Sequence, residues 1–278
     1  MLEAIHTALR FEFMQNALMA GILVSIACGI IGSFVVVNRI VFISGGIAHA
    51  AYGGIGLGYF FQFNPLFGAI AFSLISAVGM GLVERKTKQR SDTIIGVMWA
   101  LGMAIGIIFI DLTPGYKADL MSYLFGSILT VPRTDLMVML GLDVLIFILV
   151  VSLYKELVAI SFDPVFATTR NIPVDYLYLV LVAAIGLTVV MVMQVVGLIL
   201  VIALLTVPAA ISTQFVKDIK QMMVLSSLFG IIFTMTGLWF SYFFNLTSGA
   251  TIILVSCGGY LLSLGVKAYW DRIAPSSS

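Results

Sequence analysis

The chain has 278 residues, of which 61% are hydrophobic and only 10% are charged, and its mean hydropathy is +1.15. These values exclude an ordinary water-soluble domain and predict an all-α polytopic membrane protein, folded as one domain over residues 1–278. The formal net charge of +1 excludes a strongly basic protein of the kind that binds nucleic acid. Residues 1–12 mix charged and apolar side chains, so we expect an interfacial helix there and no cleavable signal peptide.

Apolar runs of about 20 residues, the length that crosses the hydrocarbon core, predict the membrane spans. The run from 197 to 215 is the least secure, because Gly197 and Pro208 interrupt it and almost no gap separates it from the span before. That pair could instead be a broken or re-entrant element, which would leave eight full spans. We predict nine spans, at about 16–37, 42–61, 64–84, 93–111, 134–153, 176–195, 197–215, 221–244 and 249–267.

Lysine and arginine residues in the connections predict the orientation, because cytoplasmic loops carry an excess of basic residues. With the amino terminus outside and the carboxyl terminus inside, eleven of the 14 basic residues lie on the cytoplasmic side and three lie outside. Removing one span would spoil this distribution, which favours nine spans over eight. The inner residues are Arg39, Arg85, Lys86, Lys88, Arg90, Lys155, Arg170, Lys217, Lys220, Lys267 and Arg272, and the outer ones are Arg10, Lys117 and Arg133.

The second predicted span contains a histidine, His49, within the run S-G-G-I-A-H-A-A-Y-G-G-I-G-L-G-Y-F-F from Ser44 to Phe61. Its six glycines are typical of a helix that other backbones approach closely. A titratable imidazole at membrane depth is costly, so we interpret His49 as a cation ligand or a proton carrier. The alternative is a histidine that forms a hydrogen bond between packed helices.

Two further features lie in the middle of the chain. Asp143 sits within an apolar run, where an unpaired carboxylate would be costly. It is either a pathway carboxylate or a partner in a helix–helix hydrogen bond. The segment Y-L-F-G-S-I-L at 123–129 lies in the predicted outer loop, and it is apolar enough to lie at the interface or to dip back into the protein.

The connection from 155 to 175 is the longest on the predicted cytoplasmic side. An aspartate followed by a proline is a typical helix start, and a second proline ends the segment about ten residues later. The short helix carries apolar side chains that would be poorly placed facing water, so we predict a coupling loop that binds a partner. A plain surface connector is the alternative. The predicted docking residues are Asp163, Pro164, Val165, Phe166, Ala167 and Arg170.

Several kinds of site are missing from the sequence. There is no G-x-x-x-x-G-K-[ST] motif and no polar stretch long enough to fold a nucleotide-binding domain, so any ATP hydrolysis must take place on another polypeptide. The sequence also has no Ser-His-Asp or H-E-x-x-H arrangement, and we do not predict an enzyme. Residues 274–278 are predicted to form a short disordered tail.

Six segments carry a resemblance when they are taken in order and with their spacing. They are N-R-I-V-F-I-S-G-G-I-A-H-A at 38–50, S-D-T-I-I-G at 91–96, Y-L-F-G-S-I-L at 123–129, F-D-P-V-F-A at 162–167, V-V-G-L-I-L-V-I-A-L-L-T-V-P-A-A at 195–210 and S-Y-F-F-N-L-T-S-G-A-T-I-I-L at 241–254. Together they make the chain resemble the zinc, manganese and iron permease family of ABC transporters over nearly its whole length. Members of that family work with a separate ATPase and an extracytoplasmic metal-binding protein.

In that family the segment around the matched histidine usually reads G-D-x-L-[AS]-H, with the acid and the histidine on one helix face. Here Gly45 stands at the position of the acid and His49 is retained. The resemblance implies that His49 is a metal ligand. Divalent ions normally gather several nitrogen and oxygen ligands, so Asp143, Tyr52 or a backbone carbonyl is a candidate replacement for the acid.

The resemblance also implies an architecture like that of the cobalamin and iron-siderophore permeases, with eight to nine transmembrane helices per chain. Two copies of the permease would enclose a central pathway in a bacterial or archaeal cytoplasmic membrane. The implied function is import of manganese, zinc or iron by alternating access, with ATP on the partner subunit and no cofactor on this chain. The F-D-P-V-F-A segment would be the coupling helix. The alternative is a secondary cation transporter or channel that uses His49 and Asp143 without an ATPase.

Overall fold

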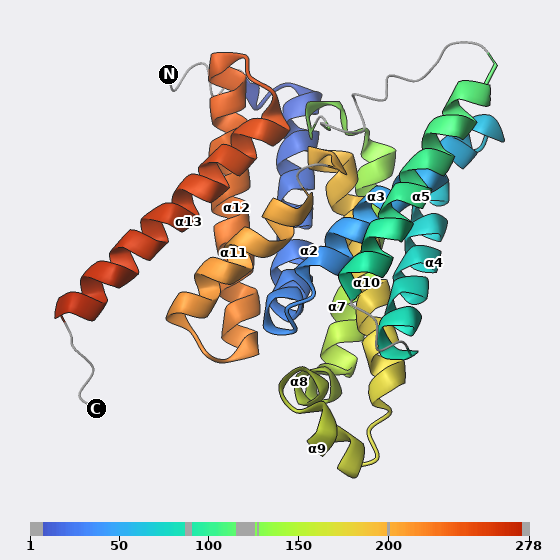
Figure 1. Cartoon of the computed structure of the whole chain (residues 1–278). Coiled ribbons are helices and arrows are strands. Elements are labelled where there is room, and N and C mark those ends of the chain that lie inside the picture. Colours follow the sequence, from blue (N-terminus) through green and yellow to red (C-terminus); the bar gives the residue numbers. More distant parts are fainter. Residues whose placement is uncertain (1–7, 87–90, 115–125, 127, 199–200, 274–278) are drawn as a thin grey trace.

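The computed structural model describes residues 8–86, 91–114, 126, 128–198 and 201–273, and over these ranges the chain is almost entirely helical (Figure 1). Helices suit an apolar chain in lipid, because they satisfy every backbone hydrogen bond within one segment. The elements are α2 (Glu12–Val37), α3 (Val41–Phe60), α4 (Pro65–Lys86), α5 (Ser91–Leu112), the 3-10 helix η1 (Ile128–Thr130), α7 (Arg133–Ser152), α8 (Tyr154–Phe162), α9 (Pro164–Thr169), α10 (Val174–Val196), α11 (Val201–Phe215), α12 (Ile219–Phe244) and α13 (Ser248–Ile273).

Within the described ranges, eight helices are long and apolar enough to cross a membrane, and α11 is a shorter apolar helix of 15 residues. At 1.5 Å per residue it extends about 22 Å, less than the roughly 30 Å of the hydrocarbon core. The seventh predicted span is therefore a helix that starts later than predicted and is too short to count as a full span, so eight full spans are found within the described ranges instead of nine. Gly197 ends α10 with a φ of 80°, a conformation that glycine adopts without strain. Pro208 lies inside α11 and does not end it.

The long helices run between two opposite ends of the molecule. We call the end where α2 begins the upper end and the end that holds α8 and α9 the lower end (Figure 1). Arg85 at the end of α4 forms an ion pair of 3.4 Å with Asp175 at the start of α10, and Lys220 at the start of α12 lies over the ring of Tyr154 in α8. Both α10 and α12 therefore begin at the lower end, and the chain returns there through α11.

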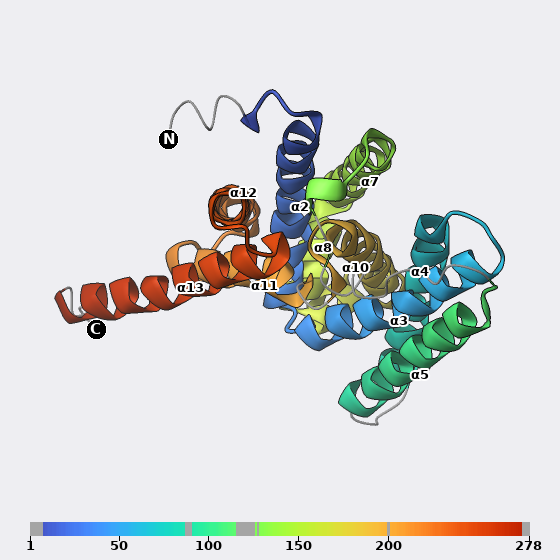
Figure 2. The ribbon, with the colours of Figure 1, turned by 90° about the horizontal axis from the view of Figure 1, so that it is seen from above.

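Helix α2 lies at the centre of one half of the molecule and packs against α7, α10, α11 and α12 (Figure 2). Small residues allow α12 to come close. A Cβ atom added to Gly29 would lie 2.6 Å from the Cα atom of Ser227, and the hydroxyl groups of Ser25 and Thr234 are 3.2 Å apart. Close backbone approach through small residues is the usual way in which helices associate in lipid, where no hydrophobic force drives them together.

Helix α3 packs mainly against α4 and α5, in the other half of the molecule. A Cβ atom on Gly54 would collide with the Gly68 carbonyl of α4, and one on Gly56 would collide with Gly106 of α5. The prediction that the glycine-rich run is approached by other backbones is therefore confirmed. These contacts hold His49 within the helix cluster.

Some predictions on connecting segments fall partly outside the described residues. Of the predicted interfacial helix at 1–12, residues 1–7 lie outside, and α2 already begins at Glu12 instead of about residue 16. The apolar segment at 123–129 is described only at Gly126, Ile128 and Leu129, where η1 begins and Ile128 is fully buried. The predicted tail at 274–278 lies outside the described residues.

Candidate functional site

His49 lies on α3 and is partly buried. Its Nδ1 atom is 2.8 Å from the backbone oxygen of Gly45, one turn earlier in the same helix. A carbonyl oxygen only accepts hydrogen bonds, so Nδ1 must carry the proton and donate it. The lone pair of the neutral imidazole is then on Nε2, the nitrogen that can bind a metal ion. The helix itself thus fixes the tautomer that ligation requires.

Trp99 of α5 covers the imidazole. The ring centroids of His49 and Trp99 are 3.6 Å apart and the ring planes differ by 28°, which is a stacked arrangement. Sequence reasoning missed Trp99. The signal that could have indicated it is its place near the middle of α5, because tryptophan in membrane proteins gathers mostly at the two interfaces.

The place of the family's acid is occupied by an apolar side chain. A Cβ atom built on Gly45 would lie 2.7 Å from the Cδ1 atom of Ile202, in α11. The turn of α3 from Gly45 to His49 is therefore bordered by α11 at Gly45 and by α5 at His49. No sequence signal indicated Ile202, because its proximity to Gly45 depends on how α11 packs against α3.

Tyr52 lies on the same interface as His49. It is 1% exposed, and a Cβ atom on Gly106 of α5 would lie 2.7 Å from its ring atom Cδ1. The side chain therefore packs between α3 and α5, two helical turns along α5 from Trp99. Of the predicted metal ligands, His49 and Tyr52 are thus brought to one helix pair.

Asp143 lies elsewhere, on α7, which packs against α2. Figure 2 shows α10 between α7 and α3. Asp143 is 8% exposed, its two carboxyl oxygens are buried, and neither oxygen has a hydrogen-bond partner among the described residues. Within these residues no group of three or more His, Cys, Asp or Glu side chains could hold a metal ion together. The predicted ligands are therefore not gathered at one point of this chain.

The predicted short helix of the coupling loop is present as α9. Its first residue is Pro164, and the carboxylate of Asp163 caps it by accepting a hydrogen bond of 2.8 Å from the backbone N–H of Phe166. Val165 and Phe166 are 75% and 52% exposed, as expected for a docking surface, but Ala167 is fully buried. Ala167 therefore supports the helix from within instead of contributing exposed surface.

The surroundings of α9 extend this surface. The guanidinium carbon of Arg170 lies 5.3 Å from the centroid of the Phe166 ring, in a cation–π contact. A hollow of about 840 Å³ lies beside α9 and is bordered by Val165, Thr169, Arg85 and Tyr176, among others. Val165, one of the exposed apolar side chains of α9, thus borders a concave surface at the lower end.

Part of the segment predicted as a loop is a second helix, α8. Its residues Leu157 and Ile160 are buried, and Ser161 accepts a hydrogen bond of 2.8 Å from the side chain of Asn38 at the end of α2. The apolar spacing at 157 and 160 was the signal that could have revealed this helix. Helix α8 fixes α9 to the helix cluster.

Comparison with known proteins gives a consistent result. The sequence model of the ABC 3 transport family matches residues 10–267. An uncharacterized membrane protein of Synechocystis sp. is 68% identical over 267 residues, which cover 96% of this chain and 95% of that protein. The manganese transport system membrane protein MntC of Listeria monocytogenes is 36% identical over 248 residues, which cover 89% of this chain and 88% of the relative.

A solved structure leads to the same family. PsaBC from Streptococcus pneumoniae, in complex with Fab, matches with a TM-score of 0.88 and 32% identity, covering 98% of this chain and 99% of that chain. The predicted resemblance is confirmed by these matches and by the eight long apolar helices. The chain belongs to the ABC 3 transport family and is a multi-pass metal transport permease of the cytoplasmic membrane, not an enzyme.

Proposed function

We propose that this permease imports a divalent metal ion by alternating access, driven by ATP hydrolysis on a separate subunit. Manganese is the favoured ion, because the relative from Listeria monocytogenes is named as a manganese transport protein. An extracytoplasmic metal-binding protein would deliver the ion, and a second copy of the permease would complete the pathway. This chain binds no cofactor of its own in the proposed cycle.

The observation that carries the proposal is the state of His49. Hydrogen bonding of Nδ1 to the Gly45 carbonyl leaves Nε2 as an acceptor, and stacking on Trp99 restricts the ring. No group of three or more metal-binding side chains surrounds it among the described residues, and one neutral imidazole by itself binds a divalent ion only weakly. Weak binding suits transport, because the ion must be released after each passage.

Docking of the ATPase is proposed at α9. The exposed side chains of Val165 and Phe166 would fill an apolar recess of the partner, as a short helix does when it binds in a groove. Helix α8 links α9 rigidly to α7, so movement of the ATPase would be passed to the spans.

The competing function, a secondary transporter or channel, requires His49 and Asp143 to act in one relay. The two residues lie on helices separated by α10, so they offer no direct relay within one chain (Figure 2). The two functions differ in the expected activity of the permease alone, because a secondary transporter is active without any other subunit.

The deciding experiment reconstitutes the permease into vesicles, alone and with its ATPase. We expect no ion uptake by the permease alone, and ATP hydrolysis by the complex that increases with manganese, zinc or iron. The order of the three ions then identifies the substrate. Uptake of equal rate without the ATPase would contradict the proposal and favour the secondary transporter.

A further inference from the structure

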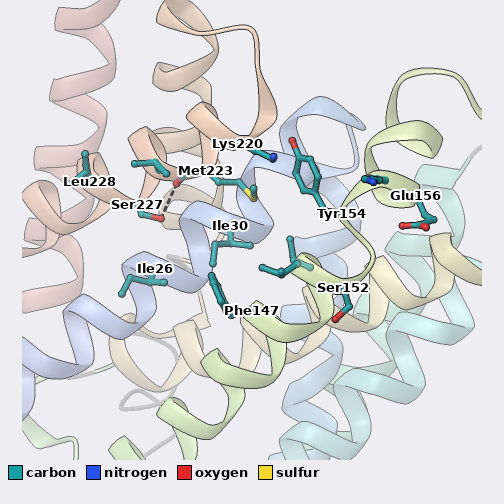
Figure 3. Close-up of a pocket in the computed structure, with 14 residues that line it drawn as sticks. Ile26, Ile30, Phe147, Ser152, Tyr154, Glu156, Lys220, Met223, Ser227 and Leu228 are labelled. Atoms are coloured by element: carbon teal, nitrogen blue, oxygen red, sulfur yellow. Dashed lines mark hydrogen bonds between the residues drawn. The ribbon is translucent and has the colours of Figure 1, made fainter.

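A groove of about 830 Å³ lies between α7 and α12 toward the lower end of the molecule (Figure 3). Both helices pack against α2, which forms the floor of the groove with Ile26 and Ile30. The residues that line the groove come from α2, α7, α8 and α12, so it involves neither the surroundings of His49 nor α9. The proposed transport cycle therefore leaves the groove without a role.

The walls of the groove are apolar over about one leaflet of the membrane. On α12, Val224 and Leu228 follow Lys220 at intervals of about one helical turn, and on α7 the same spacing separates Phe147 from Val151. All four apolar side chains are more than half exposed. The eight helical steps from Lys220 to Leu228 extend about 12 Å, close to half of the roughly 30 Å hydrocarbon core.

The charged side chains that line the groove come from the starts of α8 and α12, at its lower rim. They are Lys155, Glu156 and Lys220, and the Nζ atom of Lys220 lies 4.9 Å from the centroid of the Tyr154 ring. Burial and the nearby carboxylate of Asp218 raise the pKa of the Tyr154 phenol above its ordinary value, so the hydroxyl keeps its proton at neutral pH. The rim thus has two ammonium groups and one hydroxyl as hydrogen-bond donors; Glu156 also lines it, and the carboxylate of Asp218 lies near Tyr154.

This arrangement is amphipathic along the membrane normal. We propose that the groove binds an acidic phospholipid of the cytoplasmic leaflet, with an acyl chain between α7 and α12 and the headgroup phosphate at Lys220 and Lys155. Basic pockets between transmembrane helices on the cytoplasmic side recognise acidic headgroups in this way. A water-soluble ligand would leave the apolar walls uncovered, and the predicted orientation places the lower rim at the cytoplasmic surface.

The test uses the full-length permease, purified in mild detergent with the subunits that accompany it. The protein is incubated with equal amounts of phosphatidylglycerol and phosphatidylcholine, and retained lipid is counted by native mass spectrometry. We expect the wild type to retain phosphatidylglycerol preferentially. Lys220→Gln and Lys155→Gln should each reduce this preference about fivefold, because each removes one charge near the headgroup. The matched control, Lys267→Gln on α13, removes an exposed lysine away from the groove and should change nothing.

A second variant tests the apolar part. Val224 is 63% exposed, so Val224→Trp fills the groove without disturbing the packed helices, and it should reduce retention of both lipids. Equal retention of the two lipids by the wild type, or an unchanged preference in Lys155→Gln/Lys220→Gln, would overturn the proposal.

A second copy of the chain is the other possible occupant. A disulfide between two copies of Val224→Cys, made in a Cys257→Ser background, would show that occupant and overturn the lipid assignment.

Discussion

His49 has one imidazole nitrogen engaged by its own helix and one available to an ion, and Trp99 holds the ring from the neighbouring helix. The His49 imidazole and the Trp99 ring therefore meet here with different roles. His49 supplies the lone pair, while Trp99 restricts the direction in which that lone pair is presented. Substitutions at the two positions should separate these tasks.

We predict that His49→Ala abolishes most metal uptake. Trp99→Ala should reduce uptake about tenfold, the size of effect seen when a group that orients a metal ligand is lost. Trp99→Phe keeps an aromatic face and is expected to retain most of the activity. Uptake and metal-stimulated ATPase are measured on complexes of equal amount and assembly. Normal rates for His49→Ala in both assays would make it a packing residue.

Gly45 allows a more specific prediction. Gly45→Asp restores the family's acid one turn before His49, but its Cβ atom would lie 2.7 Å from the Cδ1 atom of Ile202. The single variant should therefore be less stable, by about 1–3 kcal/mol, as expected for overpacking. Adding Ile202→Ala makes room, and the double variant should bind the metal ion more tightly than the wild type. Thermal melting and equilibrium metal binding check the two effects, and Ile202→Ala alone is the control.

Among the elements, α2 and α12 depend on a glycine for their close approach. Gly29→Ala places a Cβ atom 2.6 Å from the Cα atom of Ser227, so the two backbones must separate. We expect a loss of stability of roughly 1–3 kcal/mol or more, seen as a lower melting temperature in detergent. Gly141→Ala on α7 is the matched control, because a Cβ atom there meets nothing within 4 Å. Equal melting temperatures for the two variants would contradict this account.

Helix α9 is the element predicted to contact the ATPase. Phe166→Asp places a charge on its exposed apolar face and should dissociate the complex or uncouple ATP hydrolysis from transport. Phe215→Asp, at the end of α11, is a matched control, because both phenylalanines are 52% exposed. Copurification of the ATPase and transport-linked hydrolysis measure the effect. If Phe166→Asp behaved like Phe215→Asp in both assays, docking would have to occur elsewhere.

At the scale of the whole molecule, the upper and lower ends are predicted to lie on opposite sides of the membrane. The lower end holds α8, α9 and the end of α13, and the positive-inside distribution assigns it to the cytoplasm (Figure 1). A cysteine at position 278, in a Cys257→Ser background, should be labelled by a membrane-impermeant reagent only after the cells are opened. A cysteine in place of Asn64, between α3 and α4 at the upper end, should be labelled in intact cells. The reverse pattern would invert the assignment of the groove rim and α9.

The sequence by itself determined the features that depend on neighbouring residues. Apolar runs of membrane length predicted the eight long helices to within a few residues, because crossing hydrocarbon sets both length and composition. The start of α9 was equally local, since an aspartate cap and a proline act within one turn. The family was also evident from the order and spacing of short segments, and the comparisons confirmed it.

The tertiary structure decided which side chains meet. The sequence indicated neither the contact of Trp99 with His49 nor the place of Ile202 beside Gly45, and it grouped Asp143 with His49 although α10 lies between their helices. The reason is physical. A soluble helix shows its inner face by an apolar stripe, whereas these helices are apolar on every side, so their composition does not specify which face packs inward. Which residues line a pathway or a groove then follows only from how the helices pack.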